Sequence, residues 1–333
     1  MHKSWPTHTQ NLIMHCWAQS TLNSYNHIVS KFATFCVNRD VPFPPSNSSH
    51  VAHFLSDLAC QSTRPKSILN NTVAALSCLY EGYTDVTNPL MDHDITRLCT
   101  ALVKTHTCVP RKETPIIPTK PIKDLFLSWP DNAGLTIKQL RQKTLALLAL
   151  VMMLRPSDAA PRALVYDSDT GSFQRLVFST DQISFHSDGS ASIALHGIKN
   201  DYKRDGFIIH VDHTDGGRLD PVQALKDYIL RTEHIRPLGT KPVFLTLTRP
   251  YNAITSPTVA KILEEVIAMA GLDTCIYKAK CFRPTGATLG IETNCTSDAV
   301  RQTGRWRNRD VFEEHYVHSR AQRGVAAHIL SAD

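Results

Sequence analysis

The residues best suited to chemistry lie at the ends of predicted elements, in order along the second half of the chain. Arg155 ends an apolar helix, Lys199 lies in a polar hairpin loop, and Arg283 enters a helix. Trp306 lies in a turn, and Tyr316 follows ten residues later. Two guanidinium groups can hold two oxygens of one phosphate, a lysine can donate a proton, and a phenol becomes a nucleophile when nearby cations favour its anion. These residue types suit nucleophilic attack on a phosphate ester.

Other common reaction classes lack their sequence signatures. Neither G-x-x-x-x-G-K-[ST] nor G-x-G-x-x-G occurs, and serine and cysteine nucleophile elbows are absent. The 16 histidines and 9 cysteines form no H-E-x-x-H or C-x-x-C pattern, so we expect no metal and no cofactor. The odd number and wide scatter of the cysteines predict buried free thiols in a reducing compartment.

Composition describes an ordinary globular protein with two domains. The chain has 333 residues, of which 42% are hydrophobic and 20% charged, and its net charge of +6 permits a polyanionic partner. The longest apolar stretch, Leu145 to Leu154, is far shorter than the roughly 20 residues of a membrane span. The first residues lead into no signal-peptide core. We therefore expect no membrane association.

Apolar residues in the first hundred positions recur at spacings of three and four, which is the pattern of amphipathic helices. The predicted helices are 22–35, 50–60, 64–80 and 92–104. They indicate a helical bundle over residues 1–108. A Pro-rich, basic linker is predicted over 109–121, because prolines interrupt helices.

The second domain, residues 122–333, has a mixed pattern. Alternating apolar residues predict a three-stranded antiparallel sheet from 182–185, 192–195 and 207–211. Helical spacing and capping residues predict helices at 122–129, 136–154, 221–235, 256–270, 283–292, 297–302 and 310–316, with Ser256 as an N-cap. The predicted fold class is mainly α with a small antiparallel β-sheet: an N-terminal helical bundle followed by a mixed α/β domain.

The order of the polar residues resembles the tyrosine recombinases, also called the phage integrase family. Their catalytic domain carries an arginine, a hairpin lysine, a His-x-x-Arg motif, a histidine or tryptophan, and then a tyrosine. The resemblance covers most of the chain and implies that the N-terminal bundle is the core-binding domain, which clamps duplex DNA together with the catalytic domain. The phrases Thr303-Gly304-Arg305-Trp306 and Phe312-Glu313-Glu314-His315-Tyr316-Val317-His318 resemble eukaryotic transposon recombinases more than bacterial ones.

The resemblance also implies roles for individual residues. Arg155 and Arg283 would clamp the two non-bridging oxygens of the phosphate, with Asp158 orienting Arg155. Tyr316 would form a 3′-phosphotyrosyl intermediate, and Lys199 would protonate the departing 5′ oxygen, although Lys203 is a rival for this role. The chemistry would need neither metal nor ATP, because the ester keeps the energy of the broken bond.

Two further positions complete the comparison. Trp306 would pack against the Tyr316 segment, and Lys280, which would bind a non-bridging oxygen, stands where recombinases usually have histidine. Type IB topoisomerases can have lysine there, which makes them an alternative, although they have histidine where this chain has Trp306. A DNA-binding derivative that has lost catalysis is the other alternative.

The expected function is thus that of a site-specific DNA recombinase or integrase. The expected partners are double-stranded DNA and other copies of the chain, as a tetramer on synapsed DNA. The expected location is intracellular, with chromosomal DNA, and in the nucleus if the source is eukaryotic.

Overall fold

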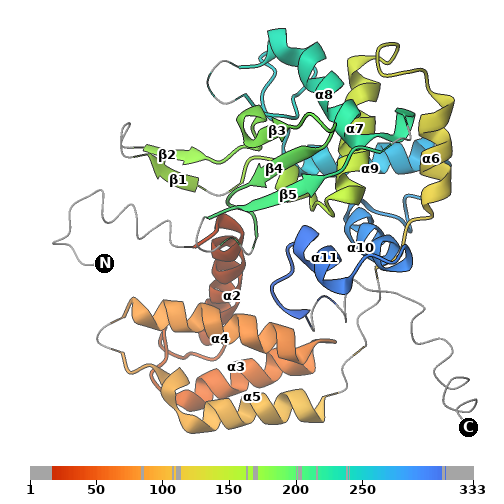
Figure 1. Cartoon of the computed structure of the whole chain (residues 1–333). Coiled ribbons are helices and arrows are strands. Elements are labelled where there is room, and N and C mark those ends of the chain that lie inside the picture. Colours follow the sequence, from red (N-terminus) through yellow and green to blue (C-terminus); the bar gives the residue numbers. More distant parts are fainter. Residues whose placement is uncertain are drawn as a thin grey trace, which may run out of the picture. The chain divides into compact units, whose positions relative to one another are not determined.

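The chain divides into two compact units, Met1–Lys112 and Glu113–Asp333 (Figure 1). The computed structural model describes residues 17–83, 86–106, 109, 114–162, 164–167, 172–199, 201, 205–214, 217–237, 239, 241–309 and 312. The division falls inside the predicted linker, 109–121. Helix α6 already begins at Thr119, so the end of that stretch is helical and not linker. Pro121 fits there because the first turn of a helix needs no N–H from proline.

The first unit contains the four helices that the apolar spacing predicted. They are α2 (Gln19–Asn38), α3 (Ser48–Cys60), α4 (Pro65–Glu81) and α5 (His93–Thr105), with a short 3-10 helix, η1 (Pro89–Met91), before the last. Asn47 caps α3 by accepting a hydrogen bond from the Ser49 N–H at 2.9 Å, and Asp92 caps α5 by accepting from Asp94 at 3.0 Å. The predicted helical bundle is confirmed.

The helices of the first unit pack their apolar faces into one core. Phe32 of α2 and Phe54 of α3 are buried with ring centroids 4.8 Å apart. Leu69 and Leu76 of α4 and Ile95 of α5 belong to the same cluster. Burial of these side chains, at roughly 1.5–3 kcal/mol each, is the main source of stability for this unit.

The second unit contains α6 (Thr119–Ser128), α7 (Ile137–Val151), α8 (Pro221–Thr232), α9 (Ser256–Met269), α10 (Phe282–Glu292) and α11 (Ser297–Thr303). All six were predicted, with small differences at the ends. The N-cap of α9 is Thr255 and not Ser256, because the Thr255 hydroxyl accepts from Thr258. The C-terminal end of the predicted helix 221–235 is a separate 3-10 helix, η5 (Glu233–Ile235). The predicted helix at 310–316 lies largely outside the described residues.

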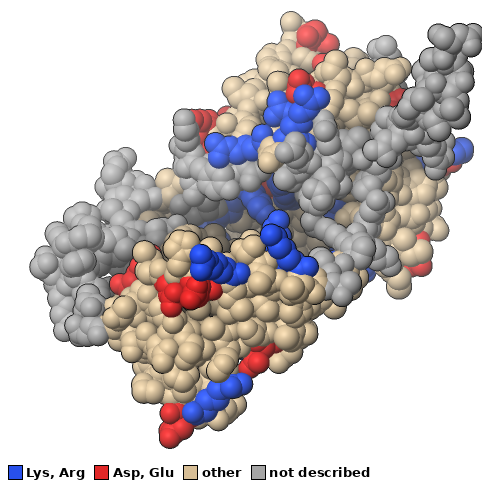
Figure 2. Space-filling model, turned by 90° about the horizontal axis from the view of Figure 1, so that it is seen from below, with Lys and Arg blue, Asp and Glu red and all other residues tan. Residues whose placement is uncertain are grey.

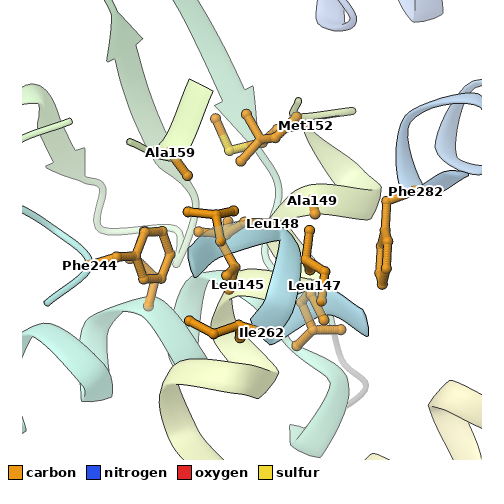
Figure 3. Close-up of a cluster of buried hydrophobic side chains, with 14 of the residues drawn as sticks. Leu145, Leu147, Leu148, Ala149, Met152, Ala159, Phe244, Ile262 and Phe282 are labelled. Carbon is orange, nitrogen blue, oxygen red and sulfur yellow. The ribbon is translucent and has the colours of Figure 1, made fainter. Parts of the chain in front are cut away.

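Helix α7 is the centre of this unit. Every residue from Leu140 to Ala149 is buried, and Figure 3 shows its leucines between Phe244, Ile262 and Phe282. The helix ends at Val151 and not at residue 154, because the chain turns at Met153, whose φ is 51°. This early turn brings Arg155 out of the helix and into the loop that follows.

The predicted three-stranded sheet is also confirmed. Strands β3 (Ile183–Phe185), β4 (Ala191–Leu195) and β5 (Phe207–Val211) are antiparallel in that order, and Ile193 lies opposite both Ile183 and Ile209. Alternate residues of β4 are buried, which places one sheet face on the core. An additional two-stranded hairpin, β1 (Leu164–Asp167) with β2 (Ser172–Arg175), was not predicted; in β2 no residue is buried, so that strand has no buried face to produce an alternating pattern.

The cysteines differ from the expectation in their exposure. The described ones are free thiols, but only Cys36 and Cys281 are buried, whereas Cys60, Cys275 and Cys295 are exposed. The prediction that they are buried is therefore wrong for those three. In the part of the chain that the structure describes, no helix is both long enough and apolar enough to cross a bilayer.

Candidate active site

The loop after α7 holds Arg155 in a defined backbone position. Its N–H donates to Asp158 Oδ2 at 2.9 Å, and the 3-10 helix η2 (Pro156–Ala159) starts at the next residue. The Arg155 side chain is partly exposed, but its Nη1 is buried and has no hydrogen-bond partner among the described residues. A buried guanidinium nitrogen without a partner is costly, so this atom favours an incoming anion.

Arg283 lies in the first turn of α10 and is buried. Its Nη1 donates to the Met153 carbonyl at 2.6 Å, and its Nη2 donates to the Gly304 carbonyl. The guanidinium carbon also lies 4.0 Å from the ring centroid of Trp306, which is cation–π geometry. Two segments distant in sequence, the turn at Met153 and the turn at Gly304 to Trp306, therefore hold this arginine.

Trp306 is buried between Arg283 and Phe312, whose ring centroid is 4.8 Å from that of Trp306. The sequence analysis expected Trp306 to pack against the segment of Tyr316. Phe312 precedes Tyr316 by four residues, but Tyr316 itself lies outside the described residues. The packing role of Trp306 toward the tyrosine stays a prediction.

Gly304 leaves room for the Trp306 ring. A Cβ at Gly304 would overlap that ring, and the chain has no slack there because Trp306 is buried. We expect Gly304→Ala to lower the free energy of unfolding of the second unit by about 1–3 kcal/mol, as overpacking does. Thermal unfolding monitored by circular dichroism would measure this, with Gly239→Ala, where a Cβ meets open space, as the control. Equal melting curves for the two variants would contradict it.

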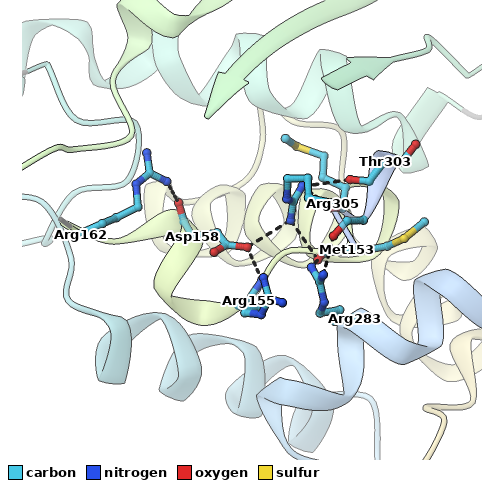
Figure 4. A network of polar contacts seen from close by, with 9 residues as sticks. Met153, Arg155, Asp158, Arg162, Arg283, Thr303 and Arg305 are labelled. Atoms are coloured by element: carbon cyan, nitrogen blue, oxygen red, sulfur yellow. Dashed lines mark hydrogen bonds and ion pairs between the residues drawn. The ribbon is translucent and has the colours of Figure 1, made fainter. Parts of the chain in front are cut away.

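Two arginines that the sequence analysis did not single out also meet Asp158 (Figure 4). Arg305 Nη2 forms an ion pair with Asp158 Oδ2 at 3.1 Å, and both side chains are almost completely buried. Arg162 Nη1 donates to the backbone carbonyl of Asp158. The Asp158 carboxylate therefore holds Arg155 by accepting the backbone N–H of Arg155, whereas it forms its ion pair with the side chain of Arg305.

Burial affects the acidity of both added arginines. It lowers the pKa of Arg162 to about 10, against the raising effect of the Asp158 carboxylate. It also lowers the pKa of Arg305, again against Asp158. Both groups remain cationic at neutral pH, since the guanidinium does not deprotonate in proteins.

The cluster carries an excess of positive charge. Four arginines belong to this network (Figure 4). The Arg305 guanidinium pairs with the Asp158 carboxylate, Arg155 donates its backbone N–H to that carboxylate, Arg162 donates to the Asp158 backbone carbonyl, and Arg283 shares the Met153 carbonyl with Arg305. Asp201 adds a second carboxylate on the side of Arg162, whose pKa it raises. Four cations against two anions leave a net positive charge that binding of a phosphate would offset.

The connection between β4 and β5 carries Lys199, which is exposed. Asp201 is buried there, and its carboxylate accepts hydrogen bonds from the N–H groups of Gly197 at 2.6 Å and Gly206 at 3.2 Å. These bonds tie the two ends of the loop together beside Lys199. Lys203, the rival candidate, lies outside the described residues.

Lys280 is exposed in the 3-10 helix η6 (Ala279–Cys281), directly before α10. No hydrogen bond or ion pair joins it to the cluster among the described residues. The structure thus brings Arg155, Asp158, Arg283 and Trp306 together, and it leaves Lys199 and Lys280 on exposed segments. Within the same residues, no group of three or more His, Cys, Asp or Glu side chains is placed to hold a metal ion.

Sequence comparison finds a distant relative. No protein-family model matches the chain. An "Integrase/recombinase xerD homolog" from Selenomonas ruminantium is 22% identical over 312 residues, which cover 90% of this chain and 81% of that protein. It does not support the eukaryotic mobile-element type expected above.

Solved structures with the same fold are recombinases and integrases. The Tn1549 transposon integrase in complex with transposon right end DNA has a TM-score of 0.58 and 12% identity, over 98% of both chains. The XerH site-specific recombinase bound to difH substrate has a TM-score of 0.55 and 16% identity, over 93% of this chain and 78% of that one. A lambda integrase dimer bound to a COC′ core site has a TM-score of 0.51. The chain therefore has the fold of the tyrosine recombinases, and its sequence relative is an integrase/recombinase homologue.

Proposed function

We propose that this chain is a site-specific tyrosine recombinase that cleaves and rejoins duplex DNA. The observation that carries the proposal is the arginine cluster, in which Arg283 bonds the carbonyl of Met153 and Arg155, two residues after Met153, is held by Asp158. Two adjacent guanidinium groups with excess positive charge suit the two non-bridging oxygens of one phosphodiester. The relative and the structural neighbours support the same function.

The proposed reaction has two transesterification steps. The Tyr316 oxygen, as its anion, attacks phosphorus and forms a 3′-phosphotyrosyl ester while the bond to the 5′ oxygen breaks. Lys199 gives its proton to that 5′ oxygen. The 5′-hydroxyl of another strand then gives its proton to the neutral Lys199, attacks the ester and releases Tyr316 as its anion. No ATP is consumed, because each step exchanges one phosphate ester for another.

We also propose that the chain acts as a tetramer on two synapsed duplexes. Exchange between two duplexes requires four strands to be cut, and one Tyr316 serves each strand. Both units would contact the DNA in this assembly.

A covalent-adduct assay tests the proposal. Duplexes that bind the chain are first selected from a random-sequence pool, and a nick is then placed near the candidate cleavage position so that the short 5′-hydroxyl fragment diffuses away after cleavage. We expect a protein–DNA band that survives denaturation. Relaxation of supercoiled DNA without a specific site would instead identify a topoisomerase, and binding with no adduct would identify a DNA-binding derivative.

Affinity for DNA is expected to fall steeply with salt. Acidic and basic side chains are interspersed on the face in Figure 2, so we expect the affinity to come from local contacts between cations and phosphates. Neutralising about six phosphates would reduce the association constant by about 10³-fold between 50 and 200 mM salt. Fluorescence anisotropy at several salt concentrations would measure the slope. An affinity that does not change with salt concentration would contradict DNA binding through phosphate contacts.

A further inference from the structure

Arg305 is a buried cation with several fixed contacts. It lies in the turn after α11 with a φ of 62°, and its side chain is fully buried. Its Nη1 donates to the Met152 carbonyl at 2.9 Å, and its Nη2 donates to the Met153 carbonyl at 3.2 Å and to Asp158 Oδ2 at 3.1 Å. One guanidinium thus joins the end of α7 to η2.

These partners are also the groups that hold Arg155 and Arg283, the two arginines proposed to bind the phosphate. Asp158 Oδ2 accepts both Arg305 Nη2 and the backbone N–H of Arg155. The Met153 carbonyl accepts both Arg305 Nη2 and Arg283 Nη1. Arg283 also donates to the carbonyl of Gly304, the residue directly before Arg305. Arg305 is therefore bonded to one anchor of each arginine.

The shape of the side chain explains why arginine serves here. The planar guanidinium presents donors in fixed directions, so it can bond two carbonyls and a carboxylate at once. The ammonium group of lysine is a compact point charge on a flexible stem, so it cannot reproduce this fork. Burying any cation is costly, and the Asp158 carboxylate offsets part of that cost.

We propose that Arg305 is a positioning residue that fixes Arg155 and Arg283 relative to each other. This inference rests on the proposed function, in which those two arginines bind the non-bridging oxygens of the phosphate. Arg305 itself is fully buried and would act through Asp158 and the Met153 carbonyl. An error of about 1 Å in such a site costs about 100-fold in rate.

The test compares Arg305→Lys with wild type on two substrates. One is the selected nicked duplex, in which the position of the cleaved phosphate is first determined from the adduct that the wild-type protein forms. The other carries a methylphosphonate at that position, which removes the charge that the clamp must neutralise. We expect Arg305→Lys to slow adduct formation about 100-fold on the phosphodiester and less than about tenfold on the methylphosphonate.

Two further variants separate positioning from folding. Arg141, in α7, is also a buried arginine; it donates to the Leu245 carbonyl at 2.7 Å and lies outside the cluster. Arg141→Lys is expected to lower the melting temperature. Its rate relative to wild type is expected to be the same on the phosphodiester as on the methylphosphonate. The double variant Arg305→Met with Asp158→Leu removes both buried charges, so it can remain folded and still lose the positioning.

The outcomes are distinct. Absence of an adduct with wild type would overturn the proposed function. A wild-type adduct together with equal loss on both substrates for Arg305→Lys would overturn the positioning role. Wild-type rates in the folded double variant would overturn it as well.

Discussion

Replacement of Tyr316 by phenylalanine is expected to abolish the covalent protein–DNA adduct while leaving DNA binding nearly unchanged. The substitution removes the one oxygen that would form the ester, and loss of a nucleophile commonly costs more than about 10⁴-fold in rate. Affinity should persist, because one hydroxyl contributes little to a large ionic interface. The adduct band on the nicked duplex and the anisotropy of a labelled duplex measure the two effects.

Tyr277→Phe is the matched control, because Tyr277 is a partly buried tyrosine of the same unit outside the arginine cluster. It should form the adduct at the wild-type rate. An adduct that persists in Tyr316→Phe would transfer the nucleophilic role to another tyrosine. The identity of that residue would follow from peptide mapping of the adduct.

The second large effect is expected for Lys199→Ala. If Lys199 protonates the departing 5′ oxygen, its loss should slow cleavage by about 10²- to 10⁴-fold, the usual contribution of a positioned acid. A substrate with sulfur in place of that oxygen needs no proton, because a thiolate is a far better leaving group. The variant should therefore cleave the sulfur substrate at close to the wild-type rate.

The comparison with Arg155→Ala gives this experiment its specificity. Arg155 would act on the non-bridging oxygens, so sulfur at the leaving position should not restore its activity. Selective rescue of Lys203→Ala in place of Lys199→Ala would shift the assignment by four residues. If the sulfur substrate rescues neither lysine variant, the next candidate for the acid is Lys280, which is exposed directly before α10.

Local patterns were sufficient to predict most elements of the fold. The helices of the first unit, the order β3-β4-β5 and the helices α8 and α9 were predicted to within a few residues, because apolar periodicity and capping residues act over one or two turns. The early end of α7 could not be predicted in this way. It depends on the turn at Met153, whose carbonyl bonds side chains more than 100 residues away.

The sequence by itself determined which residues are candidates for chemistry and their order along the chain. Only the tertiary structure decided which of them meet. Arg283 and Trp306 form a stacked pair because α10 and the turn after α11 pack on the end of α7. Arg305 was passed over because arginines are rarely buried, and its ion pair with Asp158 joins positions 147 residues apart. Such a pairing has no local signal, since it exists only where distant elements bring a carboxylate and a guanidinium together away from water.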